Sequence, residues 1–457
     1  MASRIAGMPI VSWWINGCYL LLLAVTSPWW LYRMLVRGKY RRGWREKLLG
    51  AVPPPPTGGR VVWLHAVSVG EVNVLAPLIE ALEQRFEDLV FCITTTTDTG
   101  YEVARQRYAR HCVCYAPFDF SWAVGRVLRR WRPAVIVLAE LELWPNWVRL
   151  AHRADVPLVV VNGRLSDSSF RGYRRWRWLL GGMFRRLSVV GAQSDDYAAR
   201  FAELGVPRDR VVTTGSLKFD GAQTDRDNAK TRALATWAGI TGEHVVFLAG
   251  STQEPEERLA LEAFRLLRRD HPQLRLVLVP RHPQRFGDVA RLLDASGLDW
   301  ARRSRDVRGD RPIILVDTMG ELGAWWGTAH IAYVGGTMGS REGQNMIEPA
   351  AYGAALAFGP RTRNFRDVVA LLRAEQAAVV VHDQDELIQF VRRALEDESW
   401  CRELGQRAQR VVLRQLGAVE KTISLLEPHL KRDSVHRVDG GRSIGGSLRP
   451  GSVCVKQ

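Results

Sequence analysis

Residues 59–79 read GRVVWLHAVSVGEVNVLAPLI. The apolar run Val61–Leu64 predicts a β-strand, the small residues after it predict a turn, and a helix is expected to begin near Glu71. Ligands of open α/β sheets bind at the carboxyl ends of the strands, so Glu71 lies where chemistry is expected. A simpler role is also open, because a carboxylate in the first turn of a helix interacts favourably with the helix dipole and the free N–H groups.

Short apolar segments alternate with amphipathic stretches along the rest of the chain. This alternation is typical of parallel, doubly wound α/β sheets, and a polar, aperiodic stretch at 220–230 separates two series of segments. We therefore expect an α/β chain with two Rossmann-like domains, 51–220 and 221–430. The strands expected in the first domain are Val61–Leu64, Leu89–Thr94, Val135–Leu138, Leu158–Val161, Val189–Ala192 and Val211–Thr214, and those in the second are Val245–Ala249, Leu274–Val279, Ile313–Val316, Ile331–Val334, Ala354–Phe358 and Ala378–Val381.

The composition fits two such domains and an anionic partner. The 457 residues exceed one ordinary core, and 46% hydrophobic residues suffice for two. The formal charge of +16 indicates nucleic acid, acidic lipid or a phosphorylated substrate, without distinguishing them. The six cysteines lack the C-x-x-C spacing of zinc and redox sites, and Cys112 and Cys114 lie in an apolar run that reads as a strand. Two D-x-D triplets, at 225–227 and 383–385, lie off the ligand edge and read as solvated, so we expect a metal-independent reaction.

The N-terminus predicts a membrane anchor. Between residues 9 and 35 the only charged residue is Arg33, and the stretch has the length and the flanking tryptophans of a transmembrane helix. Basic residues concentrate after it, which predicts that the main body lies on the cytoplasmic side. A cleaved signal peptide is one alternative, although Ser27–Trp30 is a poor cleavage site. A helix lying in the membrane interface is the stronger alternative, because Asn16, Gly17 and Pro28 interrupt the span.

The segments outside the two domains are assigned from their composition. Residues 1–50 form the anchor with its basic juxtamembrane segment, Pro53–Pro56 is a stiff spacer, and 431–457 is a disordered tail rich in Gly, Ser and Arg. Within the first domain, 170–186 interleaves arginines with aromatic residues. This pattern suits single-stranded nucleic acid, an anionic bilayer or an ordinary surface helix, and the neighbouring anchor favours the bilayer.

Two further polar residues of the first half are expected near Glu71. Glu140 follows the apolar run Val135–Leu138 and therefore falls on the same sheet edge, although it could equally be a helix-start carboxylate. Lys218 lies in Gly215–Asp220, near the cleft between the domains, where a cation could hold a phosphate or a developing negative charge. A solvated surface lysine is the ordinary alternative.

The second half offers loops suited to a nucleotide. Arg281 follows a strand, and the planar fork of an arginine suits a phosphate. The turns Asp317–Glu321 and Gly335–Ser340 follow two more strands, and a glycine-rich turn before a helix lets backbone N–H groups approach phosphate oxygens. The stretch Gln344–Ala351 adds a carboxylate that could accept hydrogen bonds from ribose hydroxyls.

Taken together, these segments closely resemble the 3-deoxy-D-manno-octulosonic acid (Kdo) transferase family of Gram-negative lipopolysaccharide synthesis, over residues 10–430. The resemblance implies the fold of GT-B glycosyltransferases, with an N-terminal acceptor domain and a C-terminal nucleotide-sugar domain facing a central cleft. It also implies attachment to the cytoplasmic face of the inner membrane. The blocks that carry the resemblance are His65–Glu71, Glu140–Asn146, Gly215–Asp220, Pro280–Pro283, Asp317–Leu322 and Asn345–Glu348.

The resemblance also implies an activity and the residues that perform it. Family enzymes move Kdo from CMP-Kdo to the tetraacyldisaccharide lipid A precursor (lipid IVA), so the implied partners are CMP-Kdo, this precursor and the anionic inner membrane, with no nucleic acid. Glu71 is implied as the base that deprotonates the acceptor hydroxyl, with inversion at the Kdo carbon, and Glu140 and Lys218 as groups that stabilise the transition state. The residues implied to hold CMP are Pro280, Arg281, Met319, Gly320, Glu321, Asn345, Met346, Ile347 and Glu348.

The chain departs from the family near the sugar-donor site. Gln253 and Gln344 stand where the family often has histidine, and Glu342 replaces a glycine. These departures motivate one alternative, a GT-B transferase that uses another activated sugar on a lipid acceptor. An alternative of a different class is a membrane-anchored nucleic-acid-binding protein, motivated by the net charge and by 170–186.

Overall fold

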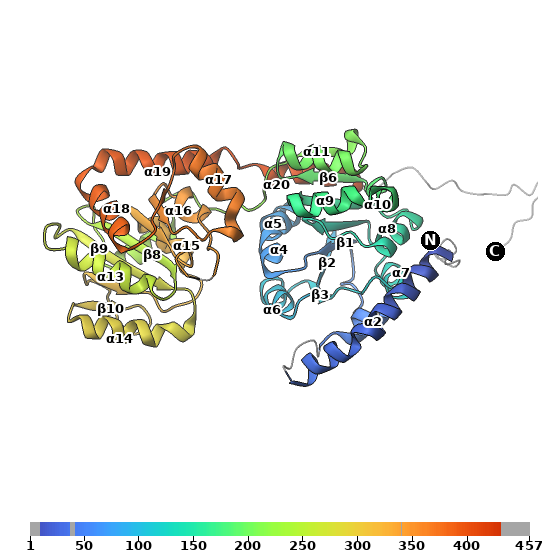
Figure 1. Cartoon of the computed structure of the whole chain (residues 1–457), viewed down its shortest axis with the longest axis horizontal. Helices are drawn as coiled ribbons and strands as arrows, with labels where there is room; N and C mark the ends of the chain where they lie inside the picture. Colours follow the sequence, from blue (N-terminus) through green and yellow to red (C-terminus); the bar gives the residue numbers. More distant parts are fainter. Residues whose placement is uncertain (1–9, 37–41, 340, 431–457) are drawn as a thin grey trace, which may run out of the picture.

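The computed structural model describes residues 10–36, 42–339 and 341–430. Two α/β units follow one another along the chain, each built on a seven-stranded parallel sheet (Figure 1). The tail at 431–457, expected to be disordered, and part of the basic segment after the expected anchor lie outside the described residues.

The first sheet has the strand order β3-β2-β1-β4-β5-β6-β7. Because the order reverses between β1 and β4, their carboxyl ends form the switch point at which open α/β sheets bind ligands. His65, the last residue of β1, pairs in register with Leu138 of β4, so the segments after these two strands begin side by side. The strands are β1 (Arg60–His65), β2 (Leu89–Thr95), β3 (Cys112–Tyr115), β4 (Val135–Ala139), β5 (Leu158–Gly163), β6 (Val189–Ala192) and β7 (Val211–Thr213).

The second sheet has the order β10-β11-β9-β8-β12-β13-β14, and its switch point lies between β8 and β12. Every strand expected from the sequence is present, and β10 is the one that the sequence analysis missed, since Trp300-Ala301-Arg302 is not a continuous apolar run. The strands are β8 (Val245–Thr252), β9 (Leu274–Pro280), β10 (Trp300–Arg302), β11 (Ile313–Leu315), β12 (Ile331–Val334), β13 (Ala355–Phe358) and β14 (Val379–Val380).

Helices cover both faces of each sheet, because the strands are apolar on both sides. In β1, Trp63 packs into the cluster on one face, while Val62 and Leu64 pack into the cluster on the other. The helices that accompany the first sheet are α3 (Trp44–Leu49), α4 (Val69–Val74), α5 (Ala76–Arg85), α6 (Asp98–Arg107), α7 (Ser121–Trp131), α8 (Pro145–Arg153), α9 (Asp167–Arg175), α10 (Arg177–Phe184) and α11 (Asp195–Leu204). Those that accompany the second are α12 (Ala229–Trp237), α13 (Glu256–Leu267), α14 (Phe286–Ser296), α15 (Leu322–Trp325), α16 (Ile347–Ala351), α17 (Arg366–Ala374), α18 (Gln384–Glu396) and α19 (Glu398–Leu413).

The C-terminal helix α20 (Ala418–Leu430) returns to the first domain (Figure 1). Its apolar face, including Ile423 and Leu426, belongs to the same core cluster as Leu78 of α5. The Asp220 carboxylate accepts hydrogen bonds from the backbone N–H groups of Gly417 and Val419 and so holds the start of this helix. The expected second domain, 221–430, therefore includes a helix whose core contacts belong to the first.

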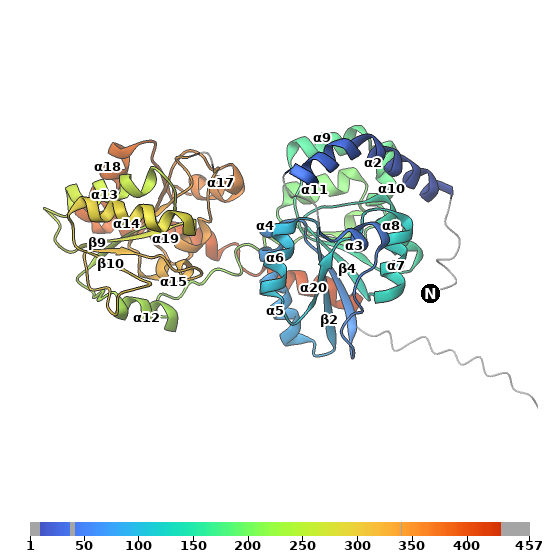
Figure 2. The same cartoon turned by 90° about the horizontal axis from the view of Figure 1, so that it is seen from below.

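The N-terminal helix α2 (Ile10–Val36) contacts α7 and α8. It runs along one side of the first domain (Figure 2). Asn16 is buried in this contact; its Nδ2 donates to Ser121 Oγ at 2.7 Å, and its Oδ1 accepts from the Ser121 backbone N–H at 3.0 Å. Within the described part of the chain, no helix is long and apolar enough to cross a membrane. The expected membrane-spanning anchor is thus not confirmed.

Candidate active site

Glu71 lies in the first turn of α4, directly after the central strand β1. Ser68 is the N-cap of this helix, and its hydroxyl accepts a hydrogen bond from the Glu71 N–H and donates one to Glu71 Oε1, at 3.4 Å and 3.0 Å. The backbone N–H of Val67 donates to Glu71 Oε2 at 2.8 Å. This exchange is helix capping, so the simpler role considered for Glu71 is present, and it also fixes the orientation of the carboxylate.

The surroundings of Glu71 shift the pKa of its carboxyl above that of an ordinary glutamate. Burial raises the pKa of the Glu71 carboxyl and the charge of Glu140 raises it further, while the hydrogen bond from Val67 and the charge of His65 act in the opposite direction. A carboxylate with a raised pKa is a stronger proton acceptor than an ordinary glutamate. This is the property that a general base requires.

Glu140 and Lys218 meet near this carboxylate. Glu140 follows β4 with a positive φ of 57°, and its N–H donates to the Val161 carbonyl at 2.9 Å. A non-glycine residue with such a φ is strained, and strain of this kind concentrates at functional sites. The Oε1 atom of Glu140 lies 4.0 Å from Nζ of Lys218, and both side chains are about one quarter exposed. Neither a helix-start carboxylate nor a free surface lysine describes this pair.

Three side chains to which the sequence analysis gave no role, His65, Glu142 and Asn162, lie around Glu71, Glu140 and Lys218. His65 is buried at the end of β1, with Nε2 at 3.2 Å from Glu142 Oε2 and Nδ1 at 3.0 Å from Thr94 Oγ1. Burial raises the pKa of Glu142, but the hydrogen bond and charge of His65 outweigh it and lower the pKa overall. Asn162 ends the apolar run of β5, and its Oδ1 accepts from the backbone N–H of Leu217 at 3.1 Å. Asn162 thus holds the loop that carries Lys218.

The sequence contained a signal for each of these three residues. Each is a polar residue at or just beyond the carboxyl end of an apolar strand, on the edge where Glu71 and Glu140 were already expected. Their partners could not be read from the sequence, because each contact joins different strand ends.

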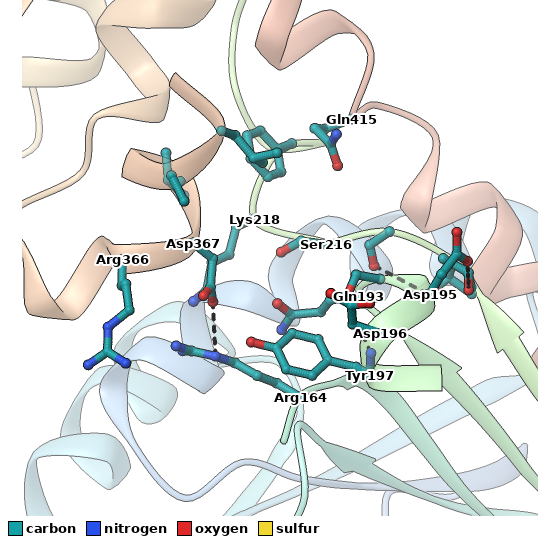
Figure 3. A pocket seen from close by; sticks show the side chains of 18 of the residues that line it. Arg164, Gln193, Asp195, Asp196, Tyr197, Ser216, Lys218, Arg366, Asp367 and Gln415 are labelled. Atoms are coloured by element: carbon teal, nitrogen blue, oxygen red, sulfur yellow. Dashed lines mark hydrogen bonds and ion pairs between the residues drawn. The ribbon is translucent and has the colours of Figure 1, made fainter. Parts of the chain in front are cut away.

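A cavity of about 670 Å³ lies between the two domains and is lined by residues of both (Figure 3). Lys218 and Arg164 reach it from the first domain and Asp367 from the second, and Arg164 Nε pairs with Asp367 Oδ2 at 3.0 Å. Glu71, Glu140 and Arg281 are not among its lining residues. Lys218 therefore lies both beside Glu140 and in the wall of the cavity between the domains.

The second domain gathers part of the expected nucleotide site. Glu348, at the start of α16, accepts a hydrogen bond from Asn345 Nδ2 at 2.9 Å. Burial raises the pKa of Glu348, and the charge of Arg281 acts against this rise. A side chain placed on Gly323 would lie 3.7 Å from Glu348 Oε2, so the start of α15 approaches the same carboxylate. Arg281, the start of α15 and Asn345–Glu348 are thus brought together.

The other residues expected to bind the nucleotide differ in how far their side chains are exposed. Glu321 pairs with Arg303 at 2.9 Å, and this hydrogen bond lowers the pKa of Glu321. Met319 is 65% exposed beside it. Met346 and Ile347 are buried in the core, so only their backbone is available to a ligand. Pro280 is the last residue of β9. Gly320 lies in the turn before α15 and has a positive φ of 86°.

The expectation that the glycine-rich turn binds phosphate through its N–H groups is wrong for residues 336–338. The carboxylate of Glu256, which is fully buried, accepts hydrogen bonds from the backbone N–H groups of Gly336, Thr337 and Met338 at 2.7, 2.9 and 3.0 Å. An internal anion already occupies these donors. Gln253 and Gln344 lie beside this turn, since a side chain placed on Gly336 would meet both.

The described residues hold no group of three or more His, Cys, Asp or Glu side chains arranged for a metal ion. The positive charges near Glu140, Glu321 and Glu348 come from lysine and arginine side chains. They are Lys218 on the first domain and Arg281 and Arg303 on the second.

Comparisons with known proteins agree with the resemblance. The family model of 3-deoxy-D-manno-octulosonic-acid transferase (kdotransferase) matches residues 42–221. The 3-deoxy-D-manno-octulosonic acid transferase of Bordetella pertussis is 34% identical over 91% of this chain and 99% of its own, and that of Haemophilus influenzae is 32% identical over 91% and 96%. A glycosyltransferase from Rickettsia africae is similar in fold, with a TM-score of 0.50 and 12% identity over 82% of this chain and all of its own.

Proposed function

Since the chain belongs to the 3-deoxy-D-manno-octulosonic acid transferase family and is a glycosyltransferase, we propose that it transfers Kdo from CMP-Kdo to the tetraacyldisaccharide lipid A precursor. The single observation that carries this proposal is the fixed Glu71 carboxylate, whose pKa burial raises, at the switch point of the first sheet. A hydroxyl placed against that carboxylate meets a positioned base. The family membership excludes the alternative of a protein that only binds nucleic acid.

The proposed reaction is a single displacement that inverts the Kdo carbon. Glu71 accepts the proton of the acceptor hydroxyl while the hydroxyl oxygen forms a bond to the anomeric carbon of Kdo. The bond between that carbon and the phosphate oxygen breaks, and its electron pair leaves with CMP. Lys218 and Arg281 stabilise the negative charge that develops on the phosphate, so these cations take the role that a metal ion has in other transferases.

The donor site of the proposal is the cluster on the second domain. Arg281 offers its guanidinium to the phosphate, and Glu348 and Asn345 offer hydrogen-bonding groups to the ribose and the base. The neutral amides of Gln253 and Gln344 beside Gly336 favour one competing proposal, a different activated sugar. Product formation with another nucleotide sugar, and none with CMP-Kdo, would support that competitor.

We further propose that the first domain docks on the cytoplasmic face of an anionic inner membrane, which places the lipid acceptor at the site. The support is a set of exposed apolar side chains on α2 and the exposed Trp178 and Leu179 of α10, which follow the arginines of α9. An apolar face flanked by arginines suits a helix lying in the interface of an acidic bilayer. The exposed large apolar residues of α2 are Val11, Trp13, Trp14, Leu20, Leu21, Leu22, Val25, Trp29, Leu31, Tyr32, Leu35 and Val36.

The test of the proposed reaction uses the full chain in detergent with CMP-Kdo and the tetraacyl precursor. We expect a product heavier by one Kdo, and we expect Glu71→Gln to lower kcat by about 10²- to 10⁴-fold with little change in KM for CMP-Kdo. Glu80→Gln, on the exposed side of α5, is the matched control and should keep the activity of the parent chain. If Glu71→Gln transfers Kdo at the parent rate, Glu71 is not the base.

A further inference from the structure

A second, apolar pocket of about 350 Å³ lies between α2 and the carboxyl-terminal edge of the first sheet. Its volume is within the range of ligand-binding pockets. One wall comes from α2, and the others come from His65 at the end of β1 and from the segments that follow β2, β3 and β4. The lining side chains of α2 are Tyr19, Leu22, Leu23 and Thr26, and the aromatic ones opposite are Phe118, Phe120, Trp144 and Trp147.

The charged groups in the wall of this pocket are already paired within the protein. The Asp119 carboxylate accepts hydrogen bonds from the Tyr19 hydroxyl and from the backbone N–H groups of Asn146 and Trp147, at 2.9 to 3.0 Å. Glu142 pairs with His65 and also accepts from Trp144 Nε1 at 3.2 Å. A sugar or a nucleotide would compete with these bonds, whereas a hydrocarbon chain leaves them intact.

The pocket connects the catalytic group with the outer surface of α2. Its inner wall is formed by His65 and Glu142, and the charge of His65 acts on Glu71. At its outer lip, Leu22 is 60% exposed and Trp144 is 41% exposed. A chain in the pocket would therefore run from the apolar face of α2 toward the proposed base.

The contacts of α2 keep the pocket open without a ligand. Besides the two hydrogen bonds with Ser121, the Asn16 side chain accepts from Asn146 Nδ2 at 3.2 Å, and the Tyr19 hydroxyl reaches Asp119. Two segments of the domain, the one from β3 into α7 and the one from β4 into α8, are thus tied to the helix. A preformed apolar site binds with a smaller ordering cost than a site that must assemble.

We propose that this pocket binds one acyl chain of the lipid acceptor and so positions the acceptor hydroxyl at Glu71. The inference rests on the proposed function, because it assigns a subsite to the acceptor of that reaction. The continuity of the pocket with the exposed apolar face of α2, which lies on the bilayer side in our proposal, identifies the occupant as a lipid chain. Acceptor affinity should then depend on chain length, by about fourfold for each methylene that the pocket buries.

The activity test fills the pocket in the full chain. Thr26→Trp projects an indole into it, and Ser27→Trp, one residue further along α2 and outside the pocket wall, is the matched control. We expect Thr26→Trp to raise KM for the tetraacyl precursor at least tenfold while KM for CMP-Kdo stays within twofold, and Ser27→Trp to leave both values unchanged. An acceptor analogue with shortened chains should lose less affinity through Thr26→Trp than the parent acceptor does.

A binding test uses the parent chain and needs no variant to fold. An acceptor whose acyl chains carry a diazirine is irradiated with the protein, and we expect the label on the lining residues Leu22, Leu23 and Thr26 and on residues 116–120. Label confined to the outer positions Leu21 and Val25, or equal KM values for Thr26→Trp and the parent chain, overturns the acyl subsite. The absence of any Kdo transfer by the parent chain overturns the proposed function instead, so the two failures are distinguishable.

Discussion

Replacing Glu256 by glutamine tests whether this buried carboxylate holds the glycine-rich turn of the second domain. Its Oε1 accepts from the backbone N–H groups of Thr337 and Met338 and from the Tyr333 hydroxyl, at 2.9, 3.0 and 3.1 Å. Its Oε2 accepts from the N–H groups of Gly336 and Gln253, at 2.7 and 2.9 Å. Glutamine has the same shape but exchanges one acceptor oxygen for an NH₂ group that can only donate.

The expected cost follows from counting the donors that lose their acceptor. Whichever position the NH₂ group of Glu256→Gln takes, two backbone N–H groups then face a donor. A buried donor left without an acceptor costs about 1–3 kcal/mol, so the free energy of unfolding of the second domain should fall by about 2–6 kcal/mol. The Tyr333 hydroxyl does not add to this sum, since it can rotate.

The assay is urea unfolding together with hydrogen exchange of the amides at 336–338. Glu256→Gln should lower the urea midpoint of the second domain and speed exchange at these amides. The control is Glu262→Gln on the same helix, whose partner Arg265 is largely exposed, and it should change the free energy of unfolding by less than about 1 kcal/mol. Equal midpoints and equal exchange in the two variants would refute the anchoring role of Glu256.

Two further predictions concern the acceptor side. Because burial raises the pKa of Glu71 and a base must be ionised, kcat/KM should fall as the pH drops through a pKa above that of an ordinary glutamate; a pH–rate profile whose acidic limb lies at or below pH ~4.3 would contradict this assignment. In sedimentation with vesicles, the chain should bind acidic lipid more strongly than zwitterionic lipid, and its binding should weaken at ~1 M salt. Trp178→Gln should weaken this binding, whereas Leu413→Gln, at an exposed position of the second domain, should not. Equal binding of the two variants to acidic vesicles would contradict the proposed docking face.

The local pattern was sufficient to predict most elements of the fold. Strands of the buried parallel type are continuous apolar runs, and of the strands that the structure describes only β10 was not located from the sequence, since the run at Cys112 and Cys114 had been read as a strand. The positions of Glu71 and Glu140 followed from the same reasoning, since each comes directly after a strand. What each carboxylate contacts did not follow. The glycine-rich turn shows why, because its amides are satisfied by a carboxylate on α13, far away in the sequence.

For the N-terminal helix, too, the local sequence predicted the element but not its contacts. Its apolar composition predicted a membrane segment, but the packing of Asn16 and Tyr19 on the first domain could not be read from periodicity, because their partners lie about a hundred residues away. The sequence by itself determined the strand and helix order, the family and the sheet edge that carries the site. Only the tertiary structure decided that α20 returns to the first domain, that Glu256 occupies the glycine-rich turn, and that α2 encloses an apolar pocket beside His65. The physical reason is that backbone periodicity is a local property, whereas burial and hydrogen-bond pairing are decided between segments distant in the chain.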